Sequence, residues 1–552
     1  MGATTDGTTS LLDDLDQDAP AVDRWLLGLT ALSVVVGVVA RFAPRSDLWL
    51  DEALSVNIAR LPLDQIPDAL RQDGHPPLYY VLLHLWTVVD TSNWWVRALS
   101  GVIALSGLPL AYLVGRRIGS RVAGDGLGAR RTGLLMLAAY AVVPYGVRYG
   151  AETRMYALVI VEVLAGYLLV DNLWSGRTTG RRRAGSAAGL ALVTASLLWT
   201  HYWSLWLVCT VGLVALWQSV RSHRPTTRTG ARWSVAALVG GGLLFAPWLP
   251  TMLYQSAHTG TPWGKPFRPT TMLLVAVVDF AGGSFAEAQL LSYVLVGLVV
   301  AGLVVRAVRD PSPHLVLGGR PLPRVRAEMG IVLVTLGLAW AVSSVSGGTF
   351  ASRYASVVYP LFLAAVAAGM ALARSPRTTA VVLAVVLAGS SVACAVEVTN
   401  DRSQSGVVAE RILADEPDRA GGSTQPPPAV VVVCPDQLGP SVGRALANRS
   451  PSGWPKIVPF PDACDPDRVD WVDYKERNAA ADPAEFVADV TTALPPQTTV
   501  YLAYNTSFTT FEGKCEGVAA ALAQDRDPEQ LVSGDADNFY EGFSLTAFRP
   551  RS

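Results

Sequence analysis

The sequence predicts a polytopic α-helical membrane protein that continues into a small C-terminal α/β domain. Of the 552 residues, 51% are hydrophobic and only 16% are charged, and the mean hydropathy is +0.32. A soluble domain carries about 25% charged residues. Apolar runs long enough to cross a bilayer recur from Leu26 to Val396. From about residue 398 onward the composition is that of a water-soluble domain.

The N-terminal segment, residues 1–23, is polar and acidic, and no positively charged region precedes the first apolar run. We therefore expect a short disordered cytoplasmic tail rather than a cleaved signal peptide. The frequent Ala, Val, Gly and Arg resemble the usage of a high-GC actinobacterium. The formal net charge of −1 points to no particular partner, and we expect none that is a nucleic acid.

Residues 24–397 form the predicted membrane domain. We expect eleven spanning helices, at roughly 25–43, 94–115, 132–149, 154–174, 185–200, 203–220, 232–253, 288–306, 329–345, 354–373 and 378–397. Arginine residues cluster in five of the connecting segments, at 116–131, 177–183, 221–232, 306–326 and 374–377. With a cytoplasmic N-terminus, all five fall on the cytoplasmic side, as the positive-inside rule requires. The predicted location is thus the plasma membrane, with the C-terminal domain outside the cytoplasm.

This topology makes residues 44–93 the first external loop. Within it, the aromatic stretch 76–90 must begin and end outside, and it is short for a span, so we expect an interfacial or re-entrant helix. The alternative is a true span, which would place the later basic loops outside. The stretch 271–284 is ambiguous in the same way.

The C-terminal part consists of a predicted linker, 398–428, and an α/β domain, 429–552. Strand-like runs at 429–433 and 498–504 alternate with helix-like runs at 438–447 and 519–523. The linker contains a stretch rich in Pro, Gly and Ser at 417–428. This alternation favours a small α/β domain.

Three cysteines, Cys434, Cys464 and Cys515, lie in the predicted exported domain, where a disulfide can persist. We prefer the pair Cys434–Cys515, because both residues lie at the edges of predicted elements, but pairing of either with Cys464 is nearly as plausible. No metal-ligand spacing such as CxxC or HExxH occurs. We therefore expect neither a metal nor another cofactor, although a divalent ion is compatible with the sequence.

Five groups of chemically active residues fall on the predicted outer face. They are Asp51 with Glu52; His75 with Tyr79 and Tyr80; Arg148, Glu152 and Arg154; His201, Tyr202 and Trp203; and Arg353 with Tyr354. Ionisable groups at a bilayer face are costly and indicate function by default. Structural alternatives exist, because Asp51 could cap a helix, the arginines could anchor the interface, and the 201–203 aromatics could belong to an ordinary aromatic belt.

This inventory suits transfer of a sugar from a lipid phosphate. The reaction needs a base for the acceptor hydroxyl, cations for the departing phosphate, and aromatic surfaces for sugar faces and isoprenoid chains. We expect Asp51 and Glu52 to be catalytic. Contacts to the donor phosphate and lipid are expected from His75, Arg148, Arg154, Arg353, Tyr79 and Tyr80. The cavity wall would comprise Glu152, His201, Tyr202, Trp203 and Tyr354.

The pair Asp51-Glu52 and the run His75-Pro76-Pro77-Leu78-Tyr79-Tyr80 resemble motifs of the GT-C superfamily of polyprenyl-phosphate-dependent glycosyltransferases. The similar branch is that of protein O-mannosyltransferases and aminoarabinose transferases, and the resemblance covers about residues 25–375. It implies that Asp51 is the general base and that the sugar carbon is inverted. His75 stands where the aminoarabinose branch has a phosphate-binding lysine.

The resemblance also implies the partners. The donor would be a polyprenyl-phosphate sugar, mannose or a related sugar, and the acceptor an extracytoplasmic glycan, glycolipid or protein. A transporter or lipid flippase is the first alternative, but it predicts midplane charges and an internal repeat. We find no repeat, and Glu162 is the only such charge that stands out. An inactive scaffold relative of the cell envelope is the second alternative.

Overall fold

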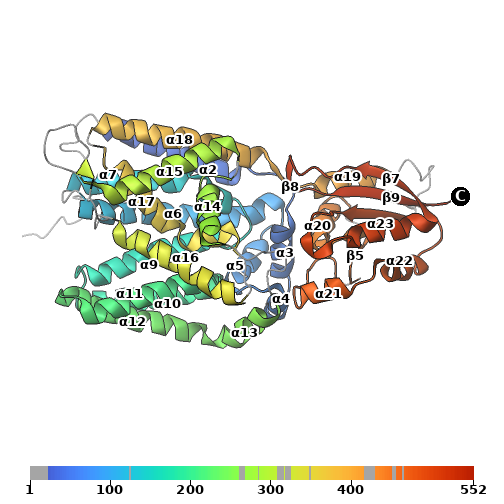
Figure 1. The fold of residues 1–552 in the computed structure, drawn as a ribbon, viewed down its shortest axis with the longest axis horizontal. Helices are drawn as coiled ribbons and strands as arrows, with labels where there is room; N and C mark the ends of the chain where they lie inside the picture. Colours follow the sequence, from blue (N-terminus) through green and yellow to red (C-terminus); the bar gives the residue numbers. More distant parts are fainter. Residues whose placement is uncertain are drawn as a thin grey trace, which may run out of the picture.

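The computed structural model places a bundle of helices at one end of the molecule and a mixed α/β domain at the other (Figure 1). It describes residues 23–122, 126–259, 268–283, 285–306, 316–317, 325–346, 350–373, 375–415, 429–450, 455–462 and 465–551. The predicted N-terminal tail up to residue 22, residues 416–428 of the predicted linker, and Cys464 lie outside the described residues.

Each predicted span corresponds to a helix. The helices at these positions are α2 (Asp23–Phe42), α6 (Asn93–Val122), α7 (Gly126–Val142), α9 (Tyr156–Trp174), α10 (Gly180–Thr200), α11 (Ser204–Arg221), α12 (Pro225–Phe245), α15 (Ala286–Val304), α16 (Arg326–Ser346), the 12-residue α17 (Tyr359–Met370) and α18 (Pro376–Thr399). Within the described part of the chain, eight helices are long and apolar enough to cross a membrane, and α7, α10 and α17 are not among them. The protein is therefore a multi-pass membrane protein, and the number of eleven spans stays a prediction.

Short helices complete the bundle, and of these α3 and α4 lie beside the C-terminal domain (Figure 1). The short helices are α3 (Leu50–Ala59), α4 (Ile66–Asp73), α5 (Leu78–Thr87), α8 (Pro144–Gly150), η1 (Ala246–Trp248), α13 (Leu249–His258), α14 (Pro269–Phe280) and η2 (Ser352–Val357). At 10 and 12 residues, α5 and α14 are too short to span a bilayer alone. For α5 this agrees with the interfacial helix expected at 76–90.

Basic side chains mark the opposite end of the bundle. There Arg121 forms ion pairs with Glu328 at 2.6 Å and with Asp171 at 2.9 Å, and Arg177 pairs with Asp171 at 2.7 Å. Arg121 and Arg177 thus lie at the end of the bundle opposite to the C-terminal domain, as the predicted topology requires. Which end faces the cytoplasm stays a prediction.

The C-terminal domain is built on a five-stranded sheet in the order β5-β4-β6-β9-β7. Its elements are β4 (Ala429–Cys434), η3 (Asp436–Leu438), α20 (Gly439–Arg449), β5 (Lys456–Pro459), α21 (Tyr474–Ala480), α22 (Pro483–Thr492), β6 (Thr499–Tyr504), η4 (Thr509–Phe511), α23 (Lys514–Asp525), β7 (Arg526–Val532) and β9 (Ser544–Pro550). Strands β5, β4 and β6 are parallel to one another, and β9 pairs antiparallel with both β6 and β7. A separate two-residue pair, β1 (Val305–Arg306) and β2 (Val316–Leu317), joins α15 to α16.

The linker predicted at 398–428 is wrong for its first half. Residues 401–415 form strand β3 (Asp401–Ser403) and helix α19 (Ser405–Asp415). Strand β3 pairs in parallel with β8 (Phe539–Glu541), and α19 buries Val408 and Ile412 in the core of the C-terminal domain. The segment belongs to the domain because its apolar residues recur at helical spacing.

A disulfide joins Cys434 at the end of β4 to Cys515 in α23. This is the pairing that the sequence favoured. It ties the centre of the sheet to the helix that covers one of its faces.

The C-terminal domain contacts the 44–93 segment at several separate points. The domain contributes Arg449, which pairs with Asp47 at 3.0 Å, and Trp471, whose backbone N–H donates to Gln72 at 3.1 Å. Further contacts are Asn57 with the carbonyl of Asp467, and Asn93 with Arg444. The loop that carries Asp51 is thus held between the bundle and the domain.

Candidate functional site

Asp51 lies in the first turn of α3, at the junction of the bundle and the C-terminal domain. Trp49 is the N-cap residue of α3 and makes no side-chain cap hydrogen bond. Asp51 is therefore inside the helix and does not cap it, which removes the structural alternative considered for this residue. Its side chain is only 14% exposed. A carboxylate in the first turn is favoured by the helix dipole.

Two arginines from distant segments face the carboxylate of Asp51. The Oδ2 atom lies 3.2 Å from Arg353 Nη1 and 3.8 Å from Arg154 Nη2. Arg353 also lies over the rings of Trp49 and Tyr354, which fixes the plane of its guanidinium group. Burial lowers the pKa of Arg353, but Asp51 and the neighbouring tyrosines together outweigh this effect, so the pKa lies well above its usual value. Both arginines are thus permanent cations beside one carboxylate.

Arg154 is fixed by a hydrogen-bond network that includes His75. Its Nη1 atom donates to Ser55 Oγ at 3.0 Å, and its Nη2 atom lies 3.0 Å from His75 Nε2. A guanidinium group has no lone pair, so Nε2 must accept. The other ring nitrogen, Nδ1, then donates to Asp73 Oδ2 at 2.8 Å. In this arrangement His75 links Arg154 to Asp73 and orients the guanidinium group of Arg154.

These side chains surround a cavity of about 90 Å³ between the bundle and the C-terminal domain. Its lining consists of Asp51, Leu54, Asp73, Gly74, His75, Arg154, Thr259, Arg353, Tyr354 and Trp471. Of the predicted site residues, the structure brings Asp51, His75, Arg154, Arg353 and Tyr354 together here. The cavity therefore combines one carboxylate with two fixed guanidinium groups and aromatic walls.

Glu52 does not line this cavity. It is fully buried and accepts two hydrogen bonds from Arg97, at 2.8 Å and 2.6 Å, and one from the backbone N–H of Thr153 at 3.0 Å. Burial raises the pKa of Glu52, but Arg97 outweighs that effect, so the pKa lies below its usual value. Glu52 thus ties α3 to the bundle as a permanent anion.

Glu152 and Arg148 lie behind the cavity, in a second ionic cluster. Glu152 Oε2 accepts from Arg402 at 2.7 Å, and Arg402 also pairs with Glu397 at 3.0 Å. Arg148 faces Asp279 at 3.6 Å and Glu397 at 3.7 Å. Neither Glu152 nor Arg148 contacts the space beside Asp51.

The predicted aromatic residues form the wall and its support. Tyr79 bonds to Ser100 at 3.0 Å, and Tyr80 donates to Asp73 at 2.8 Å, so both tyrosines are buried structural members.

Farther along the wall, the rings of His201 and Trp203 each lie 5.3 Å from that of Tyr354. Burial, reinforced by the nearby cations, holds the pKa of His201 well below its usual value, so this imidazole is neutral. Tyr202 is farther away, bonded to Trp248 and Gln255.

Several participants had no recognisable signal in the sequence. Asp73 and Arg97 are single charges, and their partners include Tyr80 in α5 for Asp73 and Glu52 in α3 for Arg97. Thr259 and Trp471 line the cavity, although neither belongs to a motif. Among the described residues, no group of three or more His, Cys, Asp or Glu side chains is arranged to hold a metal.

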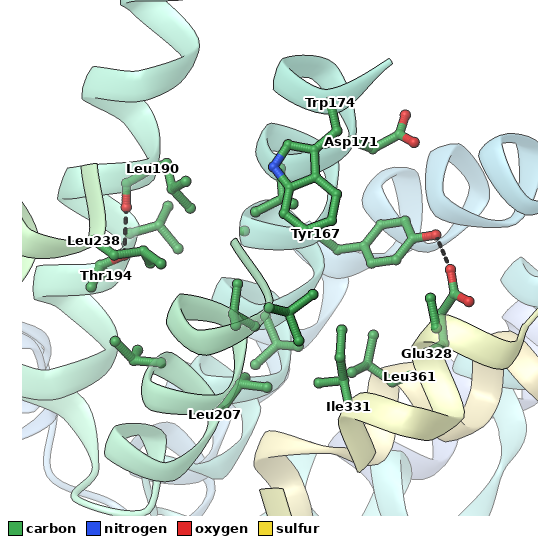
Figure 2. A pocket seen from close by; sticks show the side chains of 18 of the residues that line it. Tyr167, Asp171, Trp174, Leu190, Thr194, Leu207, Leu238, Glu328, Ile331 and Leu361 are labelled. Carbon is green, nitrogen blue, oxygen red and sulfur yellow. Dashed lines mark hydrogen bonds between the residues drawn. The ribbon is translucent and has the colours of Figure 1, made fainter. Parts of the chain in front are cut away.

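A second, larger cavity of about 330 Å³ lies among helices α9, α10, α11, α12 and α16 (Figure 2). Leu190, Leu207, Leu238 and Ile331 give it an apolar lining. Tyr167, Asp171 and Glu328 are polar residues of the lining and lie on one side of the cavity. Figure 2 shows the hydroxyl of Tyr167 bonded to Glu328 there. At the other end its lining reaches Leu197, one helical turn before His201.

Comparison with known proteins gives structural matches only: no protein-family description matches the chain, and no curated protein matches it in sequence. The crystal structure of ArnT from Cupriavidus metallidurans in the apo state matches with a TM-score of 0.54 and 11% identity, covering 96% of this chain and 98% of that chain. The structure of that ArnT bound to undecaprenyl phosphate has the same TM-score and coverage with 13% identity.

An Archaeoglobus fulgidus oligosaccharyltransferase with zinc and sulfate reaches a TM-score of 0.49 at 10% identity, over 94% of this chain and 72% of that chain. The likeness to ArnT concerns the fold alone. Membership of the GT-C superfamily stays a prediction, and so does the proposed branch within it.

Proposed function

We propose that this protein is a glycosyltransferase that moves a sugar from a polyprenyl-phosphate carrier to an acceptor outside the cytoplasm. The observation that carries the proposal is the position of Asp51 between Arg353 and Arg154 in one partly enclosed cavity. An ArnT structure of the same fold contains undecaprenyl phosphate, which supports a lipid phosphate as the ligand class. The sugar would be mannose or a related one.

In this mechanism Asp51 accepts the proton of the acceptor hydroxyl while its oxygen bonds to the anomeric carbon. The bond from that carbon to the phosphate oxygen breaks at the same time, so the configuration inverts. The donor phosphodiester carries one negative charge, and the departing polyprenyl phosphate gains a second. Arg353 and Arg154 stabilise this developing charge, because their guanidinium groups are fixed before the reaction begins. No nucleotide and no covalent enzyme intermediate is required.

In the structure, the carboxylate of Asp51 faces both Arg353 and Arg154. A bound phosphate would compete for the same guanidinium groups and so release Asp51 Oδ2. That atom is buried and accepts no well-aligned hydrogen bond from the described residues. Donor binding would thereby prepare the base.

The isoprenoid chain of the donor would lie in the apolar cavity of Figure 2. That cavity is lined by aliphatic side chains, and one end lies a single helical turn from the aromatic wall of the site. The acceptor would reach Asp51 from the junction with the C-terminal domain, where Thr259 and Trp471 line the small cavity. We propose a glycan, glycolipid or protein as the acceptor.

The test is to incubate the purified protein with a panel of radiolabelled polyprenyl-phosphate sugars and a membrane extract as the acceptor source. The proposal predicts release of polyprenyl phosphate from one donor, together with transfer of its sugar to extract material. Transport assays in liposomes address the alternative. Movement of lipid without cleavage of any donor would overturn the proposal in favour of a flippase.

A further inference from the structure

We propose that Glu541 is a positioning residue for Asp51, and that the C-terminal domain completes the site by capping the helix that carries the base. This inference rests on the glycosyl transfer proposed above, in which Asp51 takes the acceptor's proton. It gives the C-terminal domain a part in catalysis that its sequence does not indicate.

The start of α3 receives its cap from the C-terminal domain. The backbone N–H groups in the first turn of a helix have no partner within the helix. In α3 the N-cap residue, Trp49, supplies no side-chain acceptor, and the N–H of Leu50 instead donates to Glu541 Oε1 at 3.0 Å. The two residues are 491 positions apart in the sequence. A residue of another domain therefore fixes the point at which α3 begins, one residue before Asp51.

Glu541 is itself held on two sides. Its Oε2 atom accepts from Ser403 Oγ at 2.5 Å, and its backbone carbonyl accepts from the N–H of Gln404 at 3.0 Å. Strands β3 and β8 pair in parallel, with Ser403 opposite Glu541. The side chain of Gln404 in turn accepts from the N–H of Phe543 at 3.0 Å. The carboxylate thus has little freedom to move relative to α3.

Neighbours of Glu541 on the same two strands also reach the site. The ring of Tyr540 meets that of Trp49 edge-on, with centroids 4.9 Å apart, and it lies 5.4 Å from the guanidinium carbon of Arg148. On β3, Arg402 pairs with Glu152 at 2.7 Å. The β3–β8 pair therefore contacts the residue before α3, the first residue of α3, and the ionic cluster behind the cavity.

The cap matters for chemistry because the distances around Asp51 are short. Asp51 follows Leu50 directly, so a shift at the start of α3 moves its carboxylate relative to Arg353, which lies 3.2 Å away. Misplacing a reacting group by about 1 Å can cost on the order of 100-fold in rate. Truncating the side chain of Glu541 would therefore loosen the position of Asp51, although Glu541 itself does not contact the substrate.

Hydrogen exchange measures the cap without relying on activity. The variants are Glu541→Ala, the near-isosteric Glu541→Gln, and, as a matched control on the same segment, Asp537→Ala, whose side chain is exposed. For Glu541→Ala we expect the amides of residues 48–53 to exchange about tenfold faster, the equivalent of one lost hydrogen bond. Glu541→Gln retains an acceptor oxygen and should keep most of the protection, and Asp537→Ala should match wild type.

The kinetic arm separates positioning from general stability. The measurement uses a donor that the wild-type protein cleaves. With that donor, Glu541→Ala should lower kcat about tenfold or more and leave KM for the donor within about twofold. Glu541→Gln should recover most of kcat. Two outcomes of Glu541→Ala would overturn the inference. One is unchanged exchange at residues 48–53. The other is an equal loss of protection at residues 401–415 and in the five-stranded sheet, together with an unchanged kcat at a temperature where the variant is folded. A wild-type protein that cleaves no donor refutes the proposed function instead, and the exchange result remains readable.

Discussion

The Oδ2 atom of Asp51 lies 3.2 Å from Nη1 of Arg353, although 302 positions separate the two residues in the sequence. Arg353 lies in η2 and is stacked against Trp49 and Tyr354. Asp51 lies at the start of α3, which the C-terminal domain caps. The pair joins η2 at the end of the bundle to α3, and it places the proposed base and a proposed phosphate-binding cation in one cavity.

Arg353→Lys tests the proposed contact with the donor phosphate. Lysine keeps the charge but loses the planar fork that binds two phosphate oxygens and stacks on aromatic rings. We expect the affinity for undecaprenyl phosphate to fall about tenfold, the equivalent of about 1.4 kcal/mol. Titration of the detergent-solubilised protein with that lipid measures it. Arg45→Lys, at an exposed position between α2 and α3, is the control and should bind as wild type does.

Arg97→Ala tests the structural role assigned to Glu52. Removing Arg97 leaves a fully buried carboxylate with only the N–H of Thr153 as a partner. Breaking one side of a buried ion pair costs about 3–5 kcal/mol. We expect a clear drop in Tm, measured by intrinsic fluorescence. Arg60→Ala, at an exposed position directly after the helix that carries Glu52, should leave Tm unchanged. Equal Tm values for the two variants would contradict the assignment.

The stability should depend on pH through Glu541. Burial raises the pKa of Glu541 to about 7, more than its hydrogen bonds lower it, and the nearby carboxylate of Asp51 adds to the rise. Since the unfolded chain ionises near pH 4.3, the folded state holds the extra proton between about pH 4.3 and 7. Stability therefore falls as pH rises through this window, by up to about 1.4 kcal/mol per pH unit, and the trend ends above about pH 7.

Glu541→Gln isolates this contribution from the other titrating groups. The difference in unfolding free energy between wild type and Glu541→Gln should change across that window and be constant above it. Thermal melts of both proteins at a series of pH values measure the difference. A constant difference from pH 4.5 to 8 would show that Glu541 does not titrate there.

A larger residue in the apolar cavity tests the proposed place of the isoprenoid chain. Val208 lines that cavity on α11, whereas Leu213 on the same helix is exposed on the bundle surface. We expect Val208→Trp to raise KM for a long-chain donor about tenfold, the equivalent of about 1.4 kcal/mol, with little effect on kcat. Leu213→Trp should behave as wild type. A donor with a shortened chain should be less sensitive to Val208→Trp.

Much of the site could be predicted from the sequence, since charged residues at the ends of apolar helices are few. Asp51, Arg154 and Arg353 were predicted site residues, and all three line one cavity. The different orientations of Asp51 and Glu52 could not be predicted. Successive helical residues point about 100° apart, so which neighbour faces the cavity depends on how α3 packs. The packing turns Glu52 towards Arg97 and leaves Asp51 at the cavity.

The contacts that the C-terminal domain makes with the site could not be predicted from the sequence, for a different reason. Arg402 lies in a segment predicted to be a linker, and Glu541 is an isolated acid in a polar stretch. Both act through partners more than 200 positions away. Periodicity and local spacing report on a residue's own helix or strand, so they carry no information about such contacts.

Asp51→Asn tests the central claim most directly, with Asp68→Asn, an exposed acid of the same external loop, as the control. Single-turnover transfer from the cleaved donor should slow by about 10²–10⁴-fold in Asp51→Asn, since an amide cannot accept the acceptor's proton. Undecaprenyl phosphate should bind at least as tightly as to wild type, because the carboxylate no longer competes for Arg353. Transfer at the wild-type rate by Asp51→Asn would show that Asp51 is not the base.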